Sequence, residues 1–375
     1  MKILFTGGGT GGHFYPIIAI AEEIKRICIE QKIVAPELYF MSDKPYNKRV
    51  LSDNNIKFVP TTAGKIRRYF SLMNFLDFFK IIFGSIKAIF TVFSIYPDVI
   101  FGKGGYASFP GLLAARVLRI PVVIHESDSH PGRVTLWASK FATRIAVSYP
   151  EAIKYFPPEK TAIVGNPIRR GILFPAKSGA HEFLDFDKNI PTIFVVGGSQ
   201  GSIHINEVLL DILPQLLTDY QIIHQVGKKN YADLKKRADF LTKDNPNKNR
   251  YKIFDYLNDI AMRMTAGAAN LVISRAGSAI FEIANWNIPA IIIPIPEEIS
   301  HDQRTNAFTY ARSGGAVVIE EKNLTPSILL SETKRILNDK ELQAQMKAGA
   351  ASFAKPEAGE KIAEEIIRLA LEHEE

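Results

Sequence analysis

The sequence has very little cysteine and no long uncharged apolar run. Cys28 is the single cysteine among 375 residues, which excludes an internal disulfide framework or a cysteine-rich metal site and indicates a reducing compartment. The first strand-like residues are interrupted at once by glycine, so we expect no signal peptide. The most apolar stretch, residues 69–96, is interrupted by Asp77, Lys80 and Lys87, and we do not expect it to span a membrane.

Acidic residues are fewer than basic ones. The chain has 46 Lys and Arg against 39 Asp and Glu, a net charge of +7. This balance favours anionic partners such as nucleotides, phosphates, acidic lipid or nucleic acid, and charge alone does not choose among them. A chain of 375 residues with 46% apolar content suits two domains of about 150 to 200 residues each.

Glycine is concentrated in two turns, each of which follows a strand pattern. Residues 3–6 run into Gly7-Gly8-Gly9-Thr10-Gly11-Gly12-His13, and residues 193–196 run into Gly197-Gly198-Ser199-Gln200-Gly201. Glycine tolerates a tight turn, and a helix start offers free N–H groups to an anion. The two turns predict two halves, each with the fold of a nucleotide-binding domain, that face a shared cleft.

Strand and helix patterns alternate along both halves, which is typical of a parallel sheet covered by helices. We therefore predict an α/β protein with a doubly wound sheet in each half. The expected boundaries are 1–165, 166–355 and a final helix at 356–375 that packs back on the first domain. Further strands are expected at 37–41, 99–101, 122–125, 145–147, 161–164, 221–225, 271–274 and 290–294.

Gly7, Gly9 and Gly12 fit the G-x-G-x-x-G pattern of dinucleotide sites, but such a match is weak by itself. The acidic residue expected about 20 positions later is absent. A dehydrogenase would also have no need of a second glycine turn in another domain. We therefore do not predict a dinucleotide cofactor.

His13 falls in the first turn of the predicted helix. The positive end of the helix is expected to lower the pKa of His13 and to favour a neutral ring that accepts a proton. The alternative is that the ring only packs, or bonds a neighbouring carbonyl.

Taken in order along the chain, seven motifs resemble the MurG family of glycosyltransferases, which add N-acetylglucosamine to the lipid-linked muramyl pentapeptide of peptidoglycan synthesis. The resemblance implies a GT-B fold of two Rossmann-like domains, inversion at the sugar carbon, and no cofactor or essential metal. The motifs are residues 7–13, 102–106, 125–126, 165–169, 197–201, 274–277 and 303–307.

On this resemblance the C-terminal domain binds UDP-N-acetylglucosamine. Arg169 would neutralise a phosphate as UDP leaves, and Glu282 would accept the ribose hydroxyls. Without the family, Glu282 is equally a solvated helix residue, and His301 or Asp302 a helix cap. The implied ligands of the diphosphate and of the sugar are Ser199, Gln200, Gly201, Asp302 and Gln303.

The resemblance implies that the N-terminal domain binds the acceptor. His13 would remove the proton of the muramyl 4-hydroxyl, and His125 and Glu126 would tune or orient this chemistry; as an isolated pair these two would be structural. Asp128 stands where the family usually has asparagine, which leaves its role open. The implied acceptor-binding residues are Thr10, Gly11, Gly12, Gly104, Gly105, Tyr106 and Asp128.

Residues 69–95 predict an amphipathic helix with a broad apolar stripe. The stripe suits a core helix, but Lys65, Arg67 and Arg68 lie just upstream and favour contact with an anionic cytoplasmic membrane surface. We expect a peripheral enzyme on the cytoplasmic side of the cell membrane, with no nucleic-acid partner. The stripe consists of Phe75, Phe79, Ile82, Ile86, Phe90 and Phe93.

Two other functions stay open from the sequence. A UDP-N-acetylglucosamine epimerase would have the same fold and no lipid acceptor. A non-catalytic sugar-nucleotide or membrane scaffold would bind the donor without turnover. The basic apolar segment at 65–95 argues against the first, and His13, Arg169 and Glu282 together argue against the second.

Overall fold

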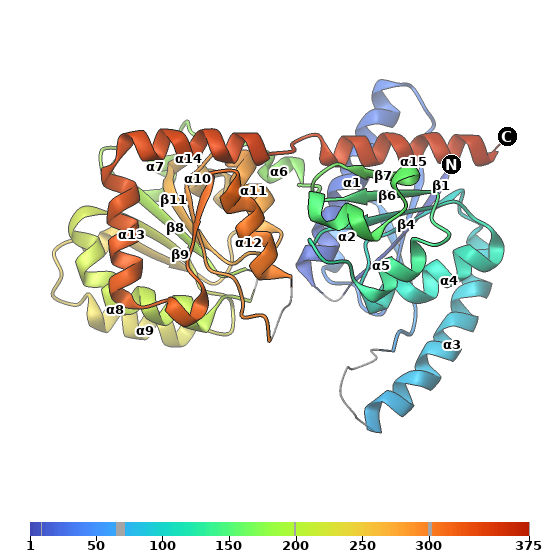
Figure 1. Cartoon of the computed structure of the whole chain (residues 1–375), viewed down its shortest axis with the longest axis horizontal. Helices are drawn as coiled ribbons and strands as arrows, with labels where there is room; N and C mark the ends of the chain where they lie inside the picture. Colours follow the sequence, from blue (N-terminus) through green and yellow to red (C-terminus); the bar gives the residue numbers. More distant parts are fainter. Residues whose placement is uncertain (9, 65–71, 199, 299–301, 375) are drawn as a thin grey trace. The chain divides into compact units, whose positions relative to one another are not determined.

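The computed structural model describes residues 1–8, 10–64, 72–198, 200–298 and 302–374 (Figure 1). The chain divides into two compact units. Unit 1 contains Met1–Arg169 and Lys355–Glu375, and unit 2 contains Arg170–Ala354. Each unit is an α/β structure built on one parallel sheet, which confirms the fold class predicted from the alternating pattern.

The sheet of unit 1 has seven parallel strands in the order β3-β2-β1-β4-β5-β6-β7. Strand order reverses between β1 and β4, and open α/β sheets bind ligands at the carboxyl ends of strands beside such a reversal. The strands are β1 Lys2–Thr6, β2 Glu37–Ser42, β3 Ile56–Pro60, β4 Val99–Gly102, β5 Val122–Glu126, β6 Arg144–Val147 and β7 Thr161–Ile163.

Helices cover both faces of this sheet, because alternate strand residues point to opposite sides. Ile3 and Phe5 of β1 pack in a core with α1 and α15, whereas Leu4 packs in a second core with α3 and α4. The helices of the unit are α1 Gly11–Glu30, α2 Lys48–Asp53, α3 Leu72–Ile95, α4 Phe109–Leu118, α5 Arg133–Ala138 and α15 Ala358–Glu374, with short 3-10 turns η1 Tyr106–Ser108, η2 Pro150–Tyr155 and η3 Pro158–Lys160.

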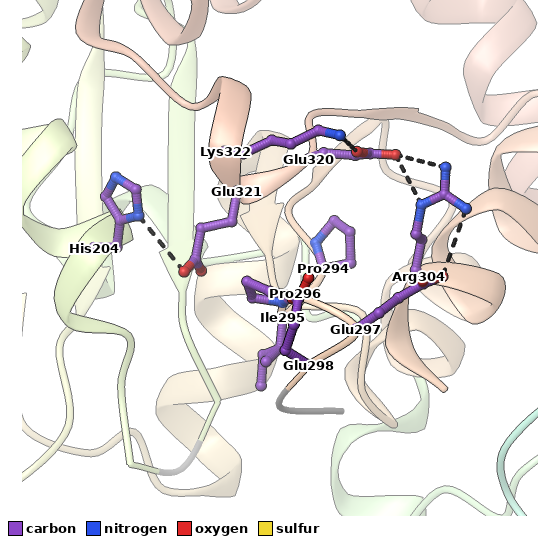
Figure 2. Close-up of a pocket in the computed structure, with 10 residues that line it drawn as sticks. All are labelled: His204, Pro294, Ile295, Pro296, Glu297, Glu298, Arg304, Glu320, Glu321 and Lys322. Atoms are coloured by element: carbon purple, nitrogen blue, oxygen red, sulfur yellow. Dashed lines mark hydrogen bonds and ion pairs between the residues drawn. The ribbon is translucent and has the colours of Figure 1, made fainter. Parts of the chain in front are cut away.

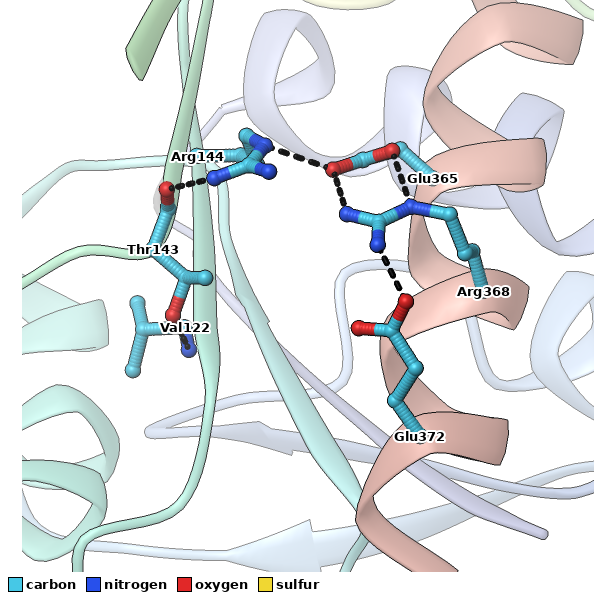
Figure 3. Close-up of polar contacts among 6 residues, drawn as sticks. All are labelled: Val122, Thr143, Arg144, Glu365, Arg368 and Glu372. Carbon is cyan, nitrogen blue, oxygen red and sulfur yellow. Dashed lines mark hydrogen bonds and ion pairs between the residues drawn. The ribbon is translucent and has the colours of Figure 1, made fainter. Parts of the chain in front are cut away.

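The last helix of the chain, α15, returns to unit 1 and packs on α1. Its buried residues Ile362 and Ile366 belong to the same core as β1. On its polar side, Glu365 accepts from Arg144 Nε of β6 at 2.7 Å and pairs with Arg368, which also pairs with Glu372 (Figure 3). An apolar face and an ion-pair network therefore both attach α15 to this unit.

Unit 2 has six parallel strands in the order β10-β9-β8-β11-β12-β13. They are β8 Thr192–Val196, β9 Gln221–Gln225, β10 Tyr251–Phe254, β11 Ala269–Ser274, β12 Ala290–Ile292 and β13 Ala316–Val318. The helices are α6 Arg170–Leu173, α7 Ala180–Leu184, α8 Ile203–Asp219, α9 Tyr231–Leu241, α10 Asp259–Ala268, α11 Ala279–Trp286, α12 Gln303–Arg312, α13 Pro326–Asn338 and α14 Lys340–Phe353, with the 3-10 turns η4 Lys248–Arg250 and η5 Glu321–Asn323.

Helix α3 lies beside α4 (Figure 1). Its buried residues include Asp77, Gly84, Ala88 and Val92, none of which belongs to the predicted apolar stripe. The core interpretation of the apolar stripe is therefore wrong for the side chains that the structure describes. Those on the outer side are exposed, namely Phe79, Ile82, Phe83, Ile86, Phe90 and Phe93.

Phe90 is the most exposed of these side chains, at 71%. Phe75 and the basic residues at 65, 67 and 68 lie outside the side chains that the structure describes. None of the helices in the described part of the chain combines the length and apolar character needed to cross a bilayer.

Candidate active site

In unit 1 the first glycine turn connects β1 to α1. A side chain at Gly8 would place its Cβ 2.4 Å from Ser42 Oγ, so only glycine fits without movement. Thr10 is the extended residue before the helix, and its carbonyl accepts from the N–H groups of His13 and Phe14. Gly11 and Gly12 begin the helix, where backbone N–H groups have no acceptor inside the helix.

His13 lies in the first turn of α1 with a defined ring orientation. Its Nδ1 lies 3.0 Å from the carbonyl oxygen of Gly8 and 3.4 Å from Thr10 Oγ1. A carbonyl only accepts, so Nδ1 carries the proton in this bond and Nε2 of the neutral ring keeps its lone pair. The ring is therefore arranged to accept a proton at Nε2.

The pKa of His13 lies below its ordinary value. Burial of the ring is the main cause, followed by the positive charge of Lys103, while Asp128 and the bond to Gly8 act in the opposite direction. The direction agrees with the sequence prediction, although burial and Lys103, rather than the helix end, produce it.

The turn after β4 brings Gly105, another predicted residue, beside His13. Gly104 and Gly105 adopt φ angles of 83° and 78°, which favour glycine. A Cβ at Gly105 would lie 3.5 Å from His13 Cε1. Tyr106 donates to Asp43 Oδ2 at 2.9 Å, and burial together with this carboxylate raises the pKa of Tyr106 to about 12.

His125 and Glu126 end β5 and are both buried. His125 Nε2 donates to the carbonyl of Gly165 at 2.9 Å, and burial holds the pKa of His125 well below its usual value. Glu126 accepts three backbone N–H groups, from Ser127, Asp128 and Gly132. Burial and Asp128 raise the pKa of Glu126 to about 7.

These bonds connect His125 and Glu126 to the backbone of Gly165 and of the loop after β5. Asp128 is less buried and lies close enough to both His13 and Lys103 to act on their charge.

Arg169 belongs to unit 1, although the sequence boundary placed it in the second domain. Its guanidinium stacks over the ring of Tyr15 in α1, 4.0 Å from the ring centre. A stacked guanidinium keeps its charge and has a fixed plane.

In unit 2 the second glycine turn connects β8 to α8. Ser199 lies outside the described residues. A Cβ at Gly201 would lie 1.8 Å from the carbonyl oxygen of Val226, so the turn packs directly on the chain after β9. Asn230 Nδ2 donates to the carbonyl of Gln200 at 3.4 Å. Ser202, which the sequence analysis did not single out, caps α8 by accepting from the N–H of Ile205.

Arg275 joins this turn to the rest of the unit. Its Nη2 donates to Ser202 Oγ at 2.7 Å and pairs with Glu321. Its Nη1 donates to the carbonyls of Ile293 and Pro294, both at 3.2 Å. A cavity of about 420 Å³ lies here, lined by Gly197, Gly201, Ser202, Ile203, His204, Glu207, Arg275, Ile295 and Glu321.

The other residues that the sequence predicted to bind UDP-N-acetylglucosamine lie at the starts of α11 and α12. Gln303 accepts from the N–H of Ile295 at 3.2 Å, and its Nε2 lies 4.0 Å from the position of a Cβ on Gly277. Glu282 is half-buried in the first turn of α11. Asp302 precedes α12, and its carbonyl, not its side chain, accepts at the helix start.

A larger cavity of about 630 Å³ lies between the segment after β12 and η5 (Figure 2). This volume is within the range of ligand pockets. Arg304 pairs with Glu320 and Glu297 on one wall, and His204 lies 3.6 Å from Glu321 on the other. Within the described residues, no group of three or more His, Cys, Asp or Glu side chains could hold a metal ion.

Comparison with known proteins agrees with this geometry. The model of the glycosyltransferase family 28 N-terminal domain matches residues 3–147, and that of the C-terminal domain matches residues 192–362. The UDP-N-acetylglucosamine--N-acetylmuramyl-(pentapeptide) pyrophosphoryl-undecaprenol N-acetylglucosamine transferase of Clostridium perfringens (strain 13) is 35% identical over 342 residues, 91% of each chain. The same enzyme of Clostridium kluyveri is 34% identical over 356 residues, 94% of this chain and 96% of the relative.

Solved structures share the fold. The crystal structure of Acinetobacter baumannii MurG has a TM-score of 0.71 and 24% identity, and covers 98% of this chain and 99% of its own. UDP-GlcNAc 2-epimerase from Neisseria meningitidis, bound to UDP-GlcNAc, has a TM-score of 0.66 and 13% identity, and covers 98% and 100%. With both domain models matched and relatives aligned along nearly the whole chain, this protein belongs to glycosyltransferase family 28, with the MurG N-acetylglucosaminyltransferases.

Proposed function

We propose that this enzyme transfers N-acetylglucosamine from UDP-N-acetylglucosamine to the 4-hydroxyl of muramyl-pentapeptide-diphosphoundecaprenol. The hydroxyl oxygen forms a bond to the anomeric carbon, the bond from that carbon to the diphosphate breaks with inversion, and UDP leaves. The proton of the hydroxyl passes to His13 Nε2. The observation that carries this proposal is the bond from His13 Nδ1 to Gly8, because it leaves Nε2 as the acceptor.

Unit 1 is proposed to bind the acceptor. The N-terminus of α1 offers the N–H groups of Gly11 and Gly12 to the acceptor diphosphate, with Thr10 exposed beside them. Gly104, Gly105 and Tyr106 would form a second wall of the acceptor site, since Gly105 lies close to the His13 ring.

Unit 2 is proposed to bind the donor. The turn before α8, with Ser199, Gln200 and Gly201, would hold the diphosphate at the N-terminus of this 17-residue helix. Glu282 would accept the ribose hydroxyls, and Asp302 and Gln303 the sugar hydroxyls.

Three residues have proposed supporting roles. Arg169 would neutralise the phosphate charge that develops as UDP leaves, and its stacking on Tyr15 fixes the guanidinium plane. His125 and Glu126 would act as positioning residues through the loops that they hold.

We further propose that the exposed apolar side of α3 binds the cytoplasmic membrane surface, which carries the lipid acceptor. Aromatic and aliphatic side chains exposed along one side of a helix are characteristic of interfacial binding, and the net charge of +7 favours anionic lipid. No nucleic-acid partner is part of this proposal.

The test is UDP release by the purified protein with donor alone and with donor plus a muramyl lipid analogue. Release only in the presence of both supports the transferase. Formation of an epimer from donor alone would favour the epimerase instead. Donor binding without turnover in either mixture would favour a scaffold.

A further inference from the structure

Lys103 is a buried lysine without a hydrogen-bond partner. The side chain is 1% exposed, and no acceptor lies within reach of Nζ among the residues that the structure describes. A buried ammonium is costly unless other charges compensate it. Lys103 lies within the motif at residues 102–106, and the proposed mechanism does not use it.

The position of Lys103 is fixed from several sides. Its backbone N–H donates to the carbonyl of Thr6 at 2.9 Å, which aligns the turn after β4 with the end of β1. A Cβ placed on Gly7 would lie 3.2 Å from Lys103 Cβ. The next residues of the same turn reach the His13 ring through Gly105.

Four titratable groups surround this lysine on neighbouring elements. Glu126, the last residue of β5, and Asp128 in the loop that follows favour the charged amine. His13 and His125 both experience its positive charge. Both oxygens of Glu126 are engaged by backbone N–H groups. The nearby Tyr106 donates to Asp43.

Lys103 and Asp128 have opposite effects on the protonation of His13, the proposed base. A carboxylate beside an imidazole favours the protonated ring, and a protonated His13 could not accept the proton of a hydroxyl. Asp128 acts on His13 in this direction, and Lys103 acts against it.

We propose that Lys103 is a positioning residue for His13, a buried positive charge that offsets Asp128 and keeps the His13 ring neutral. The role of Asp128 is then to stabilise the imidazolium once the proton has been transferred. The proposal rests on the proposed role of His13 as the base, and it gives a function to the carboxylate that stands in place of the family's asparagine.

The test is NMR titration of the His13 ring in substrate-free protein, labelled on its histidines and assigned with His13→Gln. Lys103→Met should raise the pKa of His13 by about one unit, and Asp128→Asn should lower it. The double variant should return within a few tenths of a unit of the parent. Exposed Lys140→Met in the same unit is the matched control and should cause no change.

If Lys103→Met fails to fold, Lys103→Gln takes its place. A His13 pKa that Lys103→Met leaves in place or lowers would overturn the proposal. The titration needs no substrate, so failure of the transferase assay would leave its result intact. In the active enzyme, the acid limb of the pH profile of kcat/KM should move upward in Lys103→Met and return in the double variant.

Discussion

Arg275 Nη2 donates to Ser202 Oγ at 2.7 Å and so links the segment after β11 to the cap of α8. The same guanidinium pairs with Glu321 at the start of η5. Three segments of unit 2 that are distant in sequence thus share one cation beside the glycine turn of the proposed diphosphate site.

Arg275→Met should weaken both unit 2 and donor binding. The arginine is only 12% exposed, and its loss leaves Glu321 without this counter-charge, at a cost of about 2 to 4 kcal/mol in the free energy of unfolding. UDP affinity by calorimetry should fall about tenfold or more, because the turn loses its anchor. Arg304→Met is the control, since Arg304 is 47% exposed and its ion pairs should contribute less than about 1 kcal/mol. Equal effects of the two changes would contradict this assignment.

Two glycines of the second turn should differ sharply when changed to alanine. Gly198 and Gly201 both have positive φ angles, 90° and 75°. Among the described residues, a Cβ at Gly198 meets nothing within 4 Å, whereas one at Gly201 would lie 1.8 Å from the Val226 carbonyl oxygen. Gly198→Ala should cost about 1 to 2 kcal/mol of stability, and Gly201→Ala clearly more. Denaturant unfolding of the two variants makes the comparison, and similar midpoints would refute the packing argument.

Lys103→Met should stabilise the protein in a pH-dependent way. Burial lowers the pKa of Lys103 from 10.5 to about 8, so the charged amine destabilises the fold at pH values below 8. This shift corresponds to at most about 3 kcal/mol. The gain in stability should be largest near neutral pH and should vanish as pH rises from about 8 to 10.5. Thermal unfolding across this range measures it, and a gain that grows with pH would have the wrong sign.

His13→Ala should lower turnover by about 10² to 10⁴-fold with little change in UDP affinity. The reason is that His13 belongs to unit 1, whereas the proposed donor residues Glu282 and Gln303 belong to unit 2. Single-turnover kinetics and calorimetry with UDP separate the two quantities. A parallel loss of donor affinity would argue against His13 as the base.

Phe90→Ser with Phe93→Ser should reduce binding to vesicles that contain phosphatidylglycerol. Each exposed phenylalanine that enters the interface contributes roughly 1.5 to 3 kcal/mol, so binding should fall more than tenfold. Phe240→Ser is the matched control, because Phe240 is 79% exposed on α9 of unit 2. Co-sedimentation measures binding, and melting temperatures should stay unchanged. Equal losses in both proteins would exclude α3 as the membrane-binding surface.

The predicted strands do not include β3, β10 or β13, and all three lie at sheet edges. The central strand β8 is buried throughout, and four of its five residues form a continuous apolar run that the sequence displays. The residues of β10, Tyr251–Phe254, are all half-buried, so their pattern does not stand out from a loop. An edge strand is defined by its neighbour more than by its own composition.

The sequence by itself determined the two parallel sheets, the two glycine turns and the family. These features depend on local chemistry, namely the freedom of glycine, the apolar content of buried strands and the order of the motifs. Only the tertiary structure decided that α3 exposes its aromatic side, that Arg275 anchors Ser202, and that Lys103 is buried beside His13. Each of these three features depends on a neighbour from another segment of the chain. The local sequence around a residue does not specify which segment packs beside it.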